Sequence, residues 1–229
     1  MGEKKGKKDL GADYMILIPV LLLLGLGTVV VYSASSHIAE NAVGDSYYFL
    51  RRHGLFCVLG FGAMILARHI PCTLYAKLVY PILFLALALL LLVFLPGFGH
   101  RVGGASRWLG WGPVRFQPAE VAKFSLSVYL AYSMARKVGQ MDTFSRGFLP
   151  HLMVGAGFVL LIVLQPDLGT AVIIGCWLLM MLFVGGVKLY QLIGIGLVSG
   201  LFLIGLIWQA QYRIDRWLAF LHPWKDPQG

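Results

Sequence analysis

Long uncharged hydrophobic segments alternate with short polar ones along most of the chain. Five of them lack Asp, Glu, Lys and Arg over about the 20 residues that a helix needs to cross ~30 Å of hydrocarbon: 14–36, 78–99, 147–166, 168–187 and 189–212. Two weaker segments carry charged side chains: 47–67, with Arg51 and Arg52, and 118–135, with Glu120 and Lys123. Continuous hydrophobic runs favour helices over the short alternating strands of a β-barrel. The pattern predicts an all-α, polytopic transmembrane helix bundle of about seven spans.

The composition agrees with a membrane protein. Of the 229 residues, 59% are hydrophobic and 13% are charged, whereas soluble domains carry about 25% charged residues. This excludes a disordered chain and a water-soluble enzyme. The three cysteines, Cys57, Cys72 and Cys176, have no C-x-x-C spacing, so they are interpreted as small hydrophobic side chains of the core rather than disulfide partners.

The distribution of Lys and Arg predicts a cytoplasmic N-terminus. The segment 1–13 is a basic tail with four lysines, whereas the next predicted loop, 37–50, has no Lys or Arg. In this topology the cations divide almost evenly between the two sides, although short translocated loops normally contain few of them. The outer cations could hold an anionic ligand. The alternative is that they reach lipid headgroups or pair with outer carboxylates.

Residues 96–117 form a long extracytoplasmic segment rich in Gly and Pro. The glycines and prolines predict turns, and the tryptophans suit the membrane interface. We expect an ordered re-entrant or surface-hugging loop. Arg107 beside Trp108 either places a cation over a lipid headgroup or serves only as an interfacial anchor.

Pro118 suits the first turn of the next helix. In that helix Glu120, Lys123 and Ser127 share one face. Lys123 lies about 7 Å from the helix start, and ionisable residues at such depth usually face a cavity. The alternative is a structural Glu120–Lys123 ion pair that only fixes helix packing.

Two further segments place charges on the outer side. Asp167 lies in a tight turn, where it could cap the following helix or face Lys123 or an outer arginine. The segment 212–229 has an apolar stripe at helical spacing, which predicts an interfacial helix that presents Arg213 and Arg216. The histidines show no metal-ligand spacing, and there is no nucleophile elbow or phosphate-binding loop.

Several stretches of the sequence, in order along the chain, resemble signature stretches of the bacterial SEDS family (shape, elongation, division and sporulation). They are YSASS (32–36), GASRWL (104–109), QPAEVAK (117–123), QPDLGT (165–170), YRIDR (212–216) and PWKDP (223–227). The tail and the QPAE motif are more similar to the septal division member than to the elongation member.

The resemblance implies a peptidoglycan glycosyltransferase of the inner membrane that polymerises lipid II on the outer face, at the division septum. Its implied partners are a class B penicillin-binding protein, other divisome membrane proteins and membrane lipids, with no nucleic acid. Arginines or a divalent cation, Mg²⁺ or Mn²⁺, could stabilise the departing lipid diphosphate. A lipid II flippase or other transporter, and a non-catalytic divisome scaffold, are the alternatives.

The resemblance also implies site residues. Glu120, Lys123 and Asp167 match family positions that line a central cavity, and outer positions near the headgroup are matched by Arg107, Trp108, Arg213 and Arg216. The family has more spans than are predicted here, and its catalytic Asp follows the seventh span in a stretch similar to His-Thr-Asp-Phe. The sequence reaches Gly229 before such a stretch. We therefore expect an N-terminal portion that lacks polymerase activity by itself.

Overall fold

The computed structural model describes residues 14–95, 97–102, 105–111 and 114–208. The predicted basic tail (1–13) and interfacial segment (212–229), with Arg213 and Arg216, lie outside the described residues. The chain forms two compact units, Met1–Pro71 and Cys72–Gly229.

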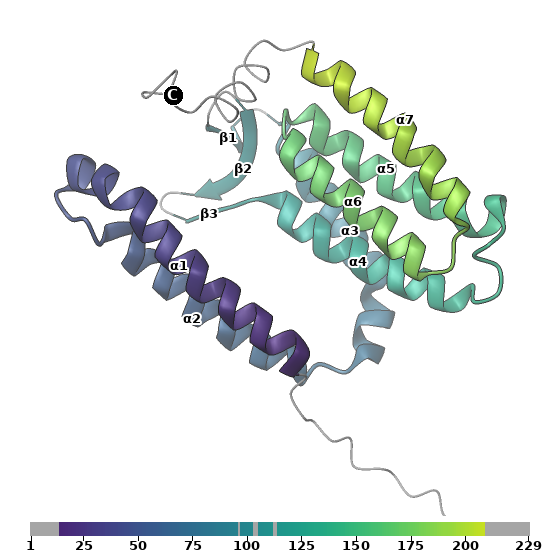
Figure 1. Cartoon of the computed structure of the whole chain (residues 1–229), viewed down its shortest axis with the longest axis horizontal. Helices are drawn as coiled ribbons and strands as arrows, with labels where there is room; N and C mark the ends of the chain where they lie inside the picture. Colours follow the sequence, from purple (N-terminus) through teal and green to yellow (C-terminus); the bar gives the residue numbers. More distant parts are fainter. Residues whose placement is uncertain (1–13, 96, 103–104, 112–113, 209–229) are drawn as a thin grey trace, which may run out of the picture. The chain divides into compact units, whose positions relative to one another are not determined.

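The first unit is a helical hairpin of α1 (Tyr14–Val43) and α2 (Tyr48–Arg68) (Figure 1). Gly44 ends α1 with φ of 71°, a left-handed conformation that glycine adopts without a Cβ clash. The Asp45 carboxylate accepts a hydrogen bond from the Tyr47 N–H at 3.0 Å and fixes the turn. The predicted loop 37–50 is therefore wrong in extent, because α1 continues to Val43.

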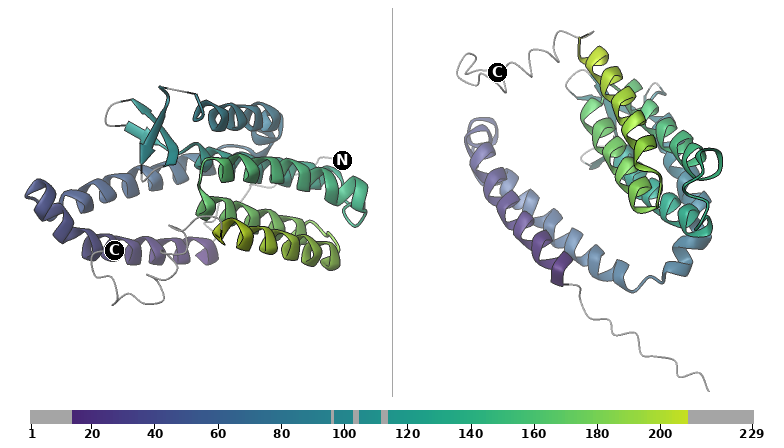
Figure 2. Two further views of the ribbon diagram at one scale, coloured as in Figure 1. Left: turned by 90° about the horizontal axis from the view of Figure 1, so that it is seen from above. Right: turned by 45° about the vertical axis from the view of Figure 1, so that its right-hand side comes forward.

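The second unit contains five further α-helices and one short π-helix. They are α3 (Cys72–Leu92), α4 (Pro118–Arg136), η1 (Phe144–Phe148), α5 (Leu149–Leu164), α6 (Leu168–Val184) and α7 (Leu189–Trp208). Figures 1 and 2 show α5, α6 and α7 side by side. With α1 and α2, the described residues form the seven predicted helices, and the predicted all-α class is confirmed.

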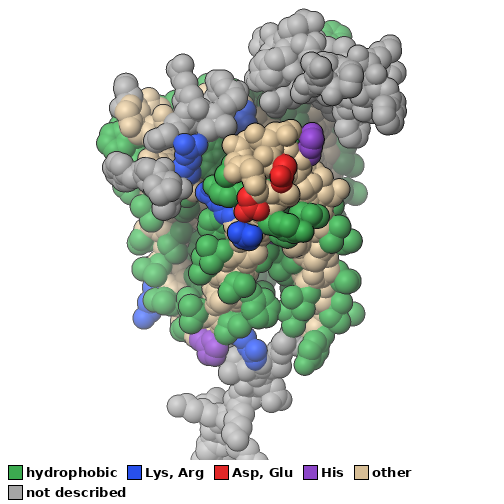
Figure 3. Space-filling model, turned by 90° about the vertical axis from the view of Figure 1, so that its left-hand side faces the viewer, with side chains coloured by type: hydrophobic (Ala, Val, Ile, Leu, Met, Phe, Trp, Pro, Cys, Tyr) green, Lys and Arg blue, Asp and Glu red, His purple; other side chains and the backbone are tan. Residues whose placement is uncertain are grey.

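Five helical segments are long and apolar enough to cross a membrane: Tyr14–Val43, Tyr48–Arg68, Cys72–Leu92, Phe144–Leu164 and Leu189–Trp208. The apolar helix α6 has 17 residues, or about 25 Å at 1.5 Å per residue. Hydrophobic side chains occupy much of the coloured surface in Figure 3. The chain is a multi-pass membrane protein.

The segment between α3 and α4 contains a three-stranded antiparallel sheet, whereas we expected an ordered re-entrant or surface-hugging loop without strands. Its strands are β1 (Gly99–Val102), β2 (Ala105–Trp111) and β3 (Val114–Phe116), in the order β1-β2-β3. Backbone N–H and C=O groups need partners, and the strand ladder supplies them. Leu109 on β2 is only 5% exposed, so the face of the sheet that carries this side chain is packed against the protein.

The core of the second unit lies where α4 packs against its neighbours. On α4 the buried residues recur at helical spacing: Ala119, Ala122, Leu126, Leu130 and Met134. The matching stripe on α6 consists of Ala171, Ile174, Leu178 and Leu182. These stripes fix how α4 and α6 are rotated, so the other face of α4 presents Glu120, Lys123 and Ser127 to a groove.

Candidate functional site

Asp167 is the centre of a polar cluster in the second unit. The cluster lies at the same end of this unit as the sheet. The Asp167 side chain is buried, and it caps α6 by accepting hydrogen bonds from the Thr170 N–H at 3.2 Å and the Thr170 hydroxyl at 2.9 Å. The Gln117 amide donates a further hydrogen bond to Oδ2 at 2.8 Å. The carboxylate therefore joins the start of α4 to the start of α6.

Arg107 reaches the same carboxylate from β2. Its Nη1 lies 3.7 Å from Asp167 Oδ1, and its Nη2 donates a hydrogen bond to the Pro166 carbonyl. The Arg107 Nε atom is buried and has no hydrogen-bond partner among the described residues. Because guanidinium has five N–H donors, Arg107 keeps hydrogen-bonding capacity for an anion while Asp167 holds it in place.

Gln165 supports this cluster from below the turn. It is 3% exposed, and its amide donates a hydrogen bond to the Leu90 carbonyl on α3 at 2.9 Å. This bond satisfies a carbonyl near the C-terminal end of α3. The turn that carries Asp167 is therefore attached to three helices: α3, α4 and α6.

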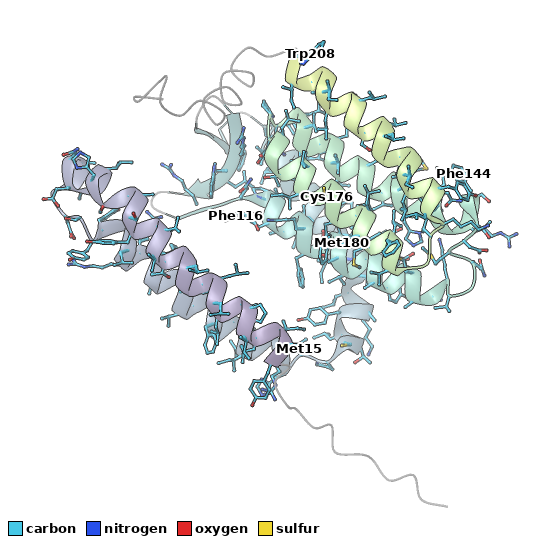
Figure 4. The ribbon with its side chains drawn as sticks, in the orientation of Figure 1. Met15, Phe116, Phe144, Cys176, Met180 and Trp208 are labelled. Atoms are coloured by element: carbon cyan, nitrogen blue, oxygen red, sulfur yellow. The ribbon has the colours of Figure 1, made fainter. Side chains whose placement is uncertain are left out.

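The second cluster begins one turn further along α4. Lys123 Nζ lies 2.7 Å from Glu120 Oε2, with side-chain exposures of 32% and 60%. The pair lines an open groove of about 570 Å³ between α4 and α6, whose other walls are mainly apolar: Phe124, Ser127, Val172, Ile173, Cys176, Trp177 and Met180. Figure 4 labels Cys176 and Met180, one turn apart on α6. The groove combines a charged end with apolar walls, which suits an amphiphile.

Trp177 fixes the groove from the α6 side. Its indole N–H donates a hydrogen bond to the Ser127 hydroxyl at 2.8 Å, and that hydroxyl donates to the Lys123 carbonyl at 2.7 Å. The backbone of Lys123 is thus connected to α6. Sequence reasoning identified Ser127 on the charged face but missed Trp177, which has no motif signal.

The structure separates the predicted site residues into two neighbouring groups. Arg107 and Asp167 meet in the first cluster, while Glu120 and Lys123 form the second. Asp167 both caps α6 and faces an arginine, so the two interpretations of this residue hold together; it does not pair with Lys123. Trp108 is half-buried on β2, opposite His100 in the strand register. Gln117 was also missed, although it lies in the QPAE motif.

The described residues do not form a metal cage. They include no group of three or more His, Cys, Asp or Glu side chains that could hold an ion. Asp167 is occupied by hydrogen bonds, and Glu120 is paired with Lys123. The expected divalent cation stays a prediction, and no step below depends on it.

Comparison with known proteins gives a consistent assignment. The family of FtsW, RodA and SpoVE cell cycle proteins matches residues 14–229. The chain is 40% identical over 215 residues to the probable peptidoglycan glycosyltransferase FtsW of Geobacter sulfurreducens, covering 94% of this chain and 58% of that protein. A protein described in the same words from Nitrosococcus halophilus is also 40% identical, with 94% of this chain and 55% of that protein covered.

Solved structures show the same fold. The rod shape determining protein RodA of Thermus thermophilus matches with a TM-score of 0.68 and 26% identity, over 88% of this chain and 61% of RodA. A structure described as showing how a peptidoglycan synthase complex coordinates polymerization and crosslinking matches with a TM-score of 0.69 and 27% identity, over 94% of this chain and 61% of the matched chain. The chain thus spans about three fifths of the length of these relatives. It belongs to the SEDS family, the FtsW, RodA and SpoVE cell cycle proteins.

Proposed function

We propose that this chain forms the lipid II-binding membrane part of a peptidoglycan glycosyltransferase of the septal division type. The observation that carries the proposal is the placement of two cations, Arg107 and Lys123, each held by its own carboxylate at the same end of α4. The relatives named as probable peptidoglycan glycosyltransferases support the reaction class.

The two cations and the apolar wall of the groove suit the two parts of a lipid diphosphate, its phosphates and its hydrocarbon chain. The cations of Arg107 and Lys123 would bind phosphate oxygens by charge-assisted hydrogen bonds. The apolar wall of the groove, with Ile173, Trp177 and Met180, would contact the first part of the hydrocarbon chain. The paired carboxylates hold the cations in position before the ligand arrives, which lowers the cost of ordering them.

Glycosyl transfer forms a bond between a sugar hydroxyl oxygen and an anomeric carbon and breaks the bond from that carbon to the diphosphate oxygen. Arg107 and Lys123 would stabilise the negative charge on the departing diphosphate. A carboxylate must take the proton of the attacking hydroxyl. We do not assign this role to Asp167 or Glu120, because both are committed to the cations.

The partner and the cellular site are part of the proposal. A class B penicillin-binding protein would crosslink the glycan that this protein makes, together with other divisome membrane proteins at the septum. This rests on the similarity to the solved synthase complex and to the FtsW proteins.

Polymerisation of labelled lipid II tests the proposal. The gene product, including any residues that follow Gly229, is purified with its class B penicillin-binding protein and assayed in detergent. Arg107→Ala and Lys123→Ala should each reduce glycan formation at least tenfold, the effect of losing about 1.4 kcal/mol of transition-state stabilisation. Lys188→Ala, a cation at the other end of the helices, serves as the control.

Two results would overturn the assignment. If the folded protein forms no glycan but moves lipid II across vesicle membranes, it is a flippase. If it does neither while still binding the penicillin-binding protein, it is a scaffold.

A further inference from the structure

A second groove, between α3 and α5, has no role in the proposed reaction. It has a volume of about 650 Å³ and almost entirely apolar walls, which include Tyr80, Phe84, Met153, Gly157, Phe158 and Leu161. From Met153 to Leu161 the groove follows α5 for about 12 Å at 1.5 Å per residue. One leaflet of a ~30 Å hydrocarbon core is about 15 Å deep, so the groove has the height of a single acyl layer.

Two tyrosines connect one end of this groove to an arginine. Tyr80 on α3 lies edge-on to Tyr132 on α4, with ring centroids 6.3 Å apart. Arg136 lies over the Tyr132 ring, 5.5 Å from its centroid, and donates a hydrogen bond to the Tyr132 hydroxyl at 2.7 Å. This bond uses one of five guanidinium N–H donors. The exposed Arg136 is therefore connected through Tyr132 to Tyr80, a residue of the groove wall, and keeps donors to spare.

The surrounding charge at this end is positive. Among the described residues of the turns that close this end of α4, α5, α6 and α7, Asp142 is the one carboxylate, against four cations: Arg136, Lys137, Arg146 and Lys188. Lys137 is engaged in part, because it donates a hydrogen bond to the Arg146 carbonyl at 3.1 Å. In the predicted topology this end is cytoplasmic. Basic pockets between membrane helices on that side suit anionic lipid headgroups.

We propose that the α3–α5 groove binds one anionic phospholipid of the cytoplasmic leaflet. An acyl chain lies along Phe84 and Phe158, and the phosphate accepts hydrogen bonds from Arg136, with Tyr80 and Tyr132 at the level of the ester groups. Tyrosine is common at this depth because its ring is apolar and its hydroxyl is polar. The site is separate from the groove of Glu120 and Lys123 and does not depend on the proposed function.

Native mass spectrometry of the full chain tests both parts of the site. The protein is exchanged into detergent with equal amounts of phosphatidylglycerol and phosphatidylcholine. We expect phosphatidylglycerol to be retained in roughly fivefold preference, the contribution of one basic side chain near an anionic headgroup. Arg136→Ala should abolish the preference, whereas Arg146→Ala, a cation at the same end outside the groove, should preserve it.

A glycine substitution tests the hydrocarbon part. Gly157 lines the groove, and a Cβ there would meet no atom within 4 Å. Gly157→Leu should therefore fold and fill the groove, which displaces both lipids. The matched control is Gly194→Leu on α7, where a Cβ also meets nothing within 4 Å, and the thermal unfolding midpoint confirms that each variant is folded.

Three outcomes would overturn the proposal. Equal retention of the two lipids by the unaltered protein would show that the protein does not distinguish an anionic headgroup from a zwitterionic one. The same preference in Arg136→Ala as in Arg146→Ala would show that Arg136 does not bind the headgroup. Unchanged lipid retention in folded Gly157→Leu would show that the groove holds no acyl chain. The occupant of the groove would then be a protein helix instead of a lipid.

Discussion

Arg107 and Asp167 come from different parts of the chain, yet Nη1 of one lies 3.7 Å from Oδ1 of the other. Arg107 extends from a small sheet, and Asp167 begins α6. The same carboxylate caps that helix through Thr170. Asp167 thus caps α6 and also positions Arg107, the cation that we assign to the lipid diphosphate. A substitution of Asp167 should therefore change both the stability of the protein and its binding of substrate.

Substitution of Asp167 should separate its two tasks. Asp167→Ala removes the cap, leaves Gln117 without its acceptor and leaves Arg107 without its ion-pair partner, so we expect the free energy of unfolding to fall by about 1–3 kcal/mol. Asp167→Asn keeps a good capping residue but removes the charge. It should lose less stability than the alanine variant while still weakening lipid II binding.

Chemical denaturation in detergent measures the stability change, and a lipid II binding assay measures the second effect. Asp142→Ala is the control, because this carboxylate is exposed in the turn after α4. Equal stability of Asp167→Ala and the control would show that the hydrogen bonds of Asp167 contribute nothing to folding.

The groove between α4 and α6 can be tested with the native cysteines. Cys176 is exposed and lines the groove, while Cys72 is exposed at the start of α3 and does not line it. An added lipid diphosphate should slow maleimide labelling of Cys176 several-fold and leave Cys72 unchanged. Mass spectrometry of the labelled peptides gives both rates. Equal protection of the two thiols would point to a general micelle effect and contradict the assigned site.

Gly147 holds the π-helix close to the turn that precedes it. An added Cβ would lie 2.5 Å from both the Cα and the carbonyl oxygen of Met141. Because these are backbone atoms, Gly147→Ala should shift the chain and lower the thermal unfolding midpoint. In contrast, a Cβ at Gly175 in α6 meets nothing within 4 Å. Gly175→Ala should leave stability unchanged or raise it by up to about 1 kcal/mol through helix propensity.

His151 connects α5 to α4 in the interior. The Gly147 carbonyl can only accept, so Nδ1 carries the proton and Nε2 accepts a hydrogen bond from the Ser133 hydroxyl at 2.9 Å. Ser133→Ala would leave this buried nitrogen without a partner, at a cost of about 1–3 kcal/mol. Thermal unfolding should show the loss against Ser145→Ala, an exposed serine at the same end. Matching midpoints for the two variants would contradict the interpretation.

The seven helices could be predicted because long apolar runs, five of them uncharged, leave the backbone few alternatives in lipid. The face shared by Glu120, Lys123 and Ser127 also followed from helical spacing. The sheet did not, since turn-rich composition was interpreted as a loop. A signal was present, because Gly103-Gly104 separates the segments that form β1 and β2, and such a pair is typical of a hairpin.

The contacts across the clusters were beyond sequence reasoning. Gln117 and Trp177 reach their partners only because α4 and α6 pack in a particular rotation, which depends on the buried stripes of both helices. Spacing along one helix cannot predict which residue of another helix it meets. For the same reason the choice of Arg107 as the partner of Asp167 was left open.

The order of synthesis gives the Asp167 cluster a consequence for biogenesis. Arg107 leaves the ribosome well before the turn that carries Pro166 and Asp167, whose atoms hold its guanidinium. The guanidinium of Arg107 therefore lacks these two partners until α4 and α5 have also been synthesised. The Arg107–Asp167 pair is thus complete only after the chain has been made as far as Asp167, so the part of the cluster that is synthesised first is held last.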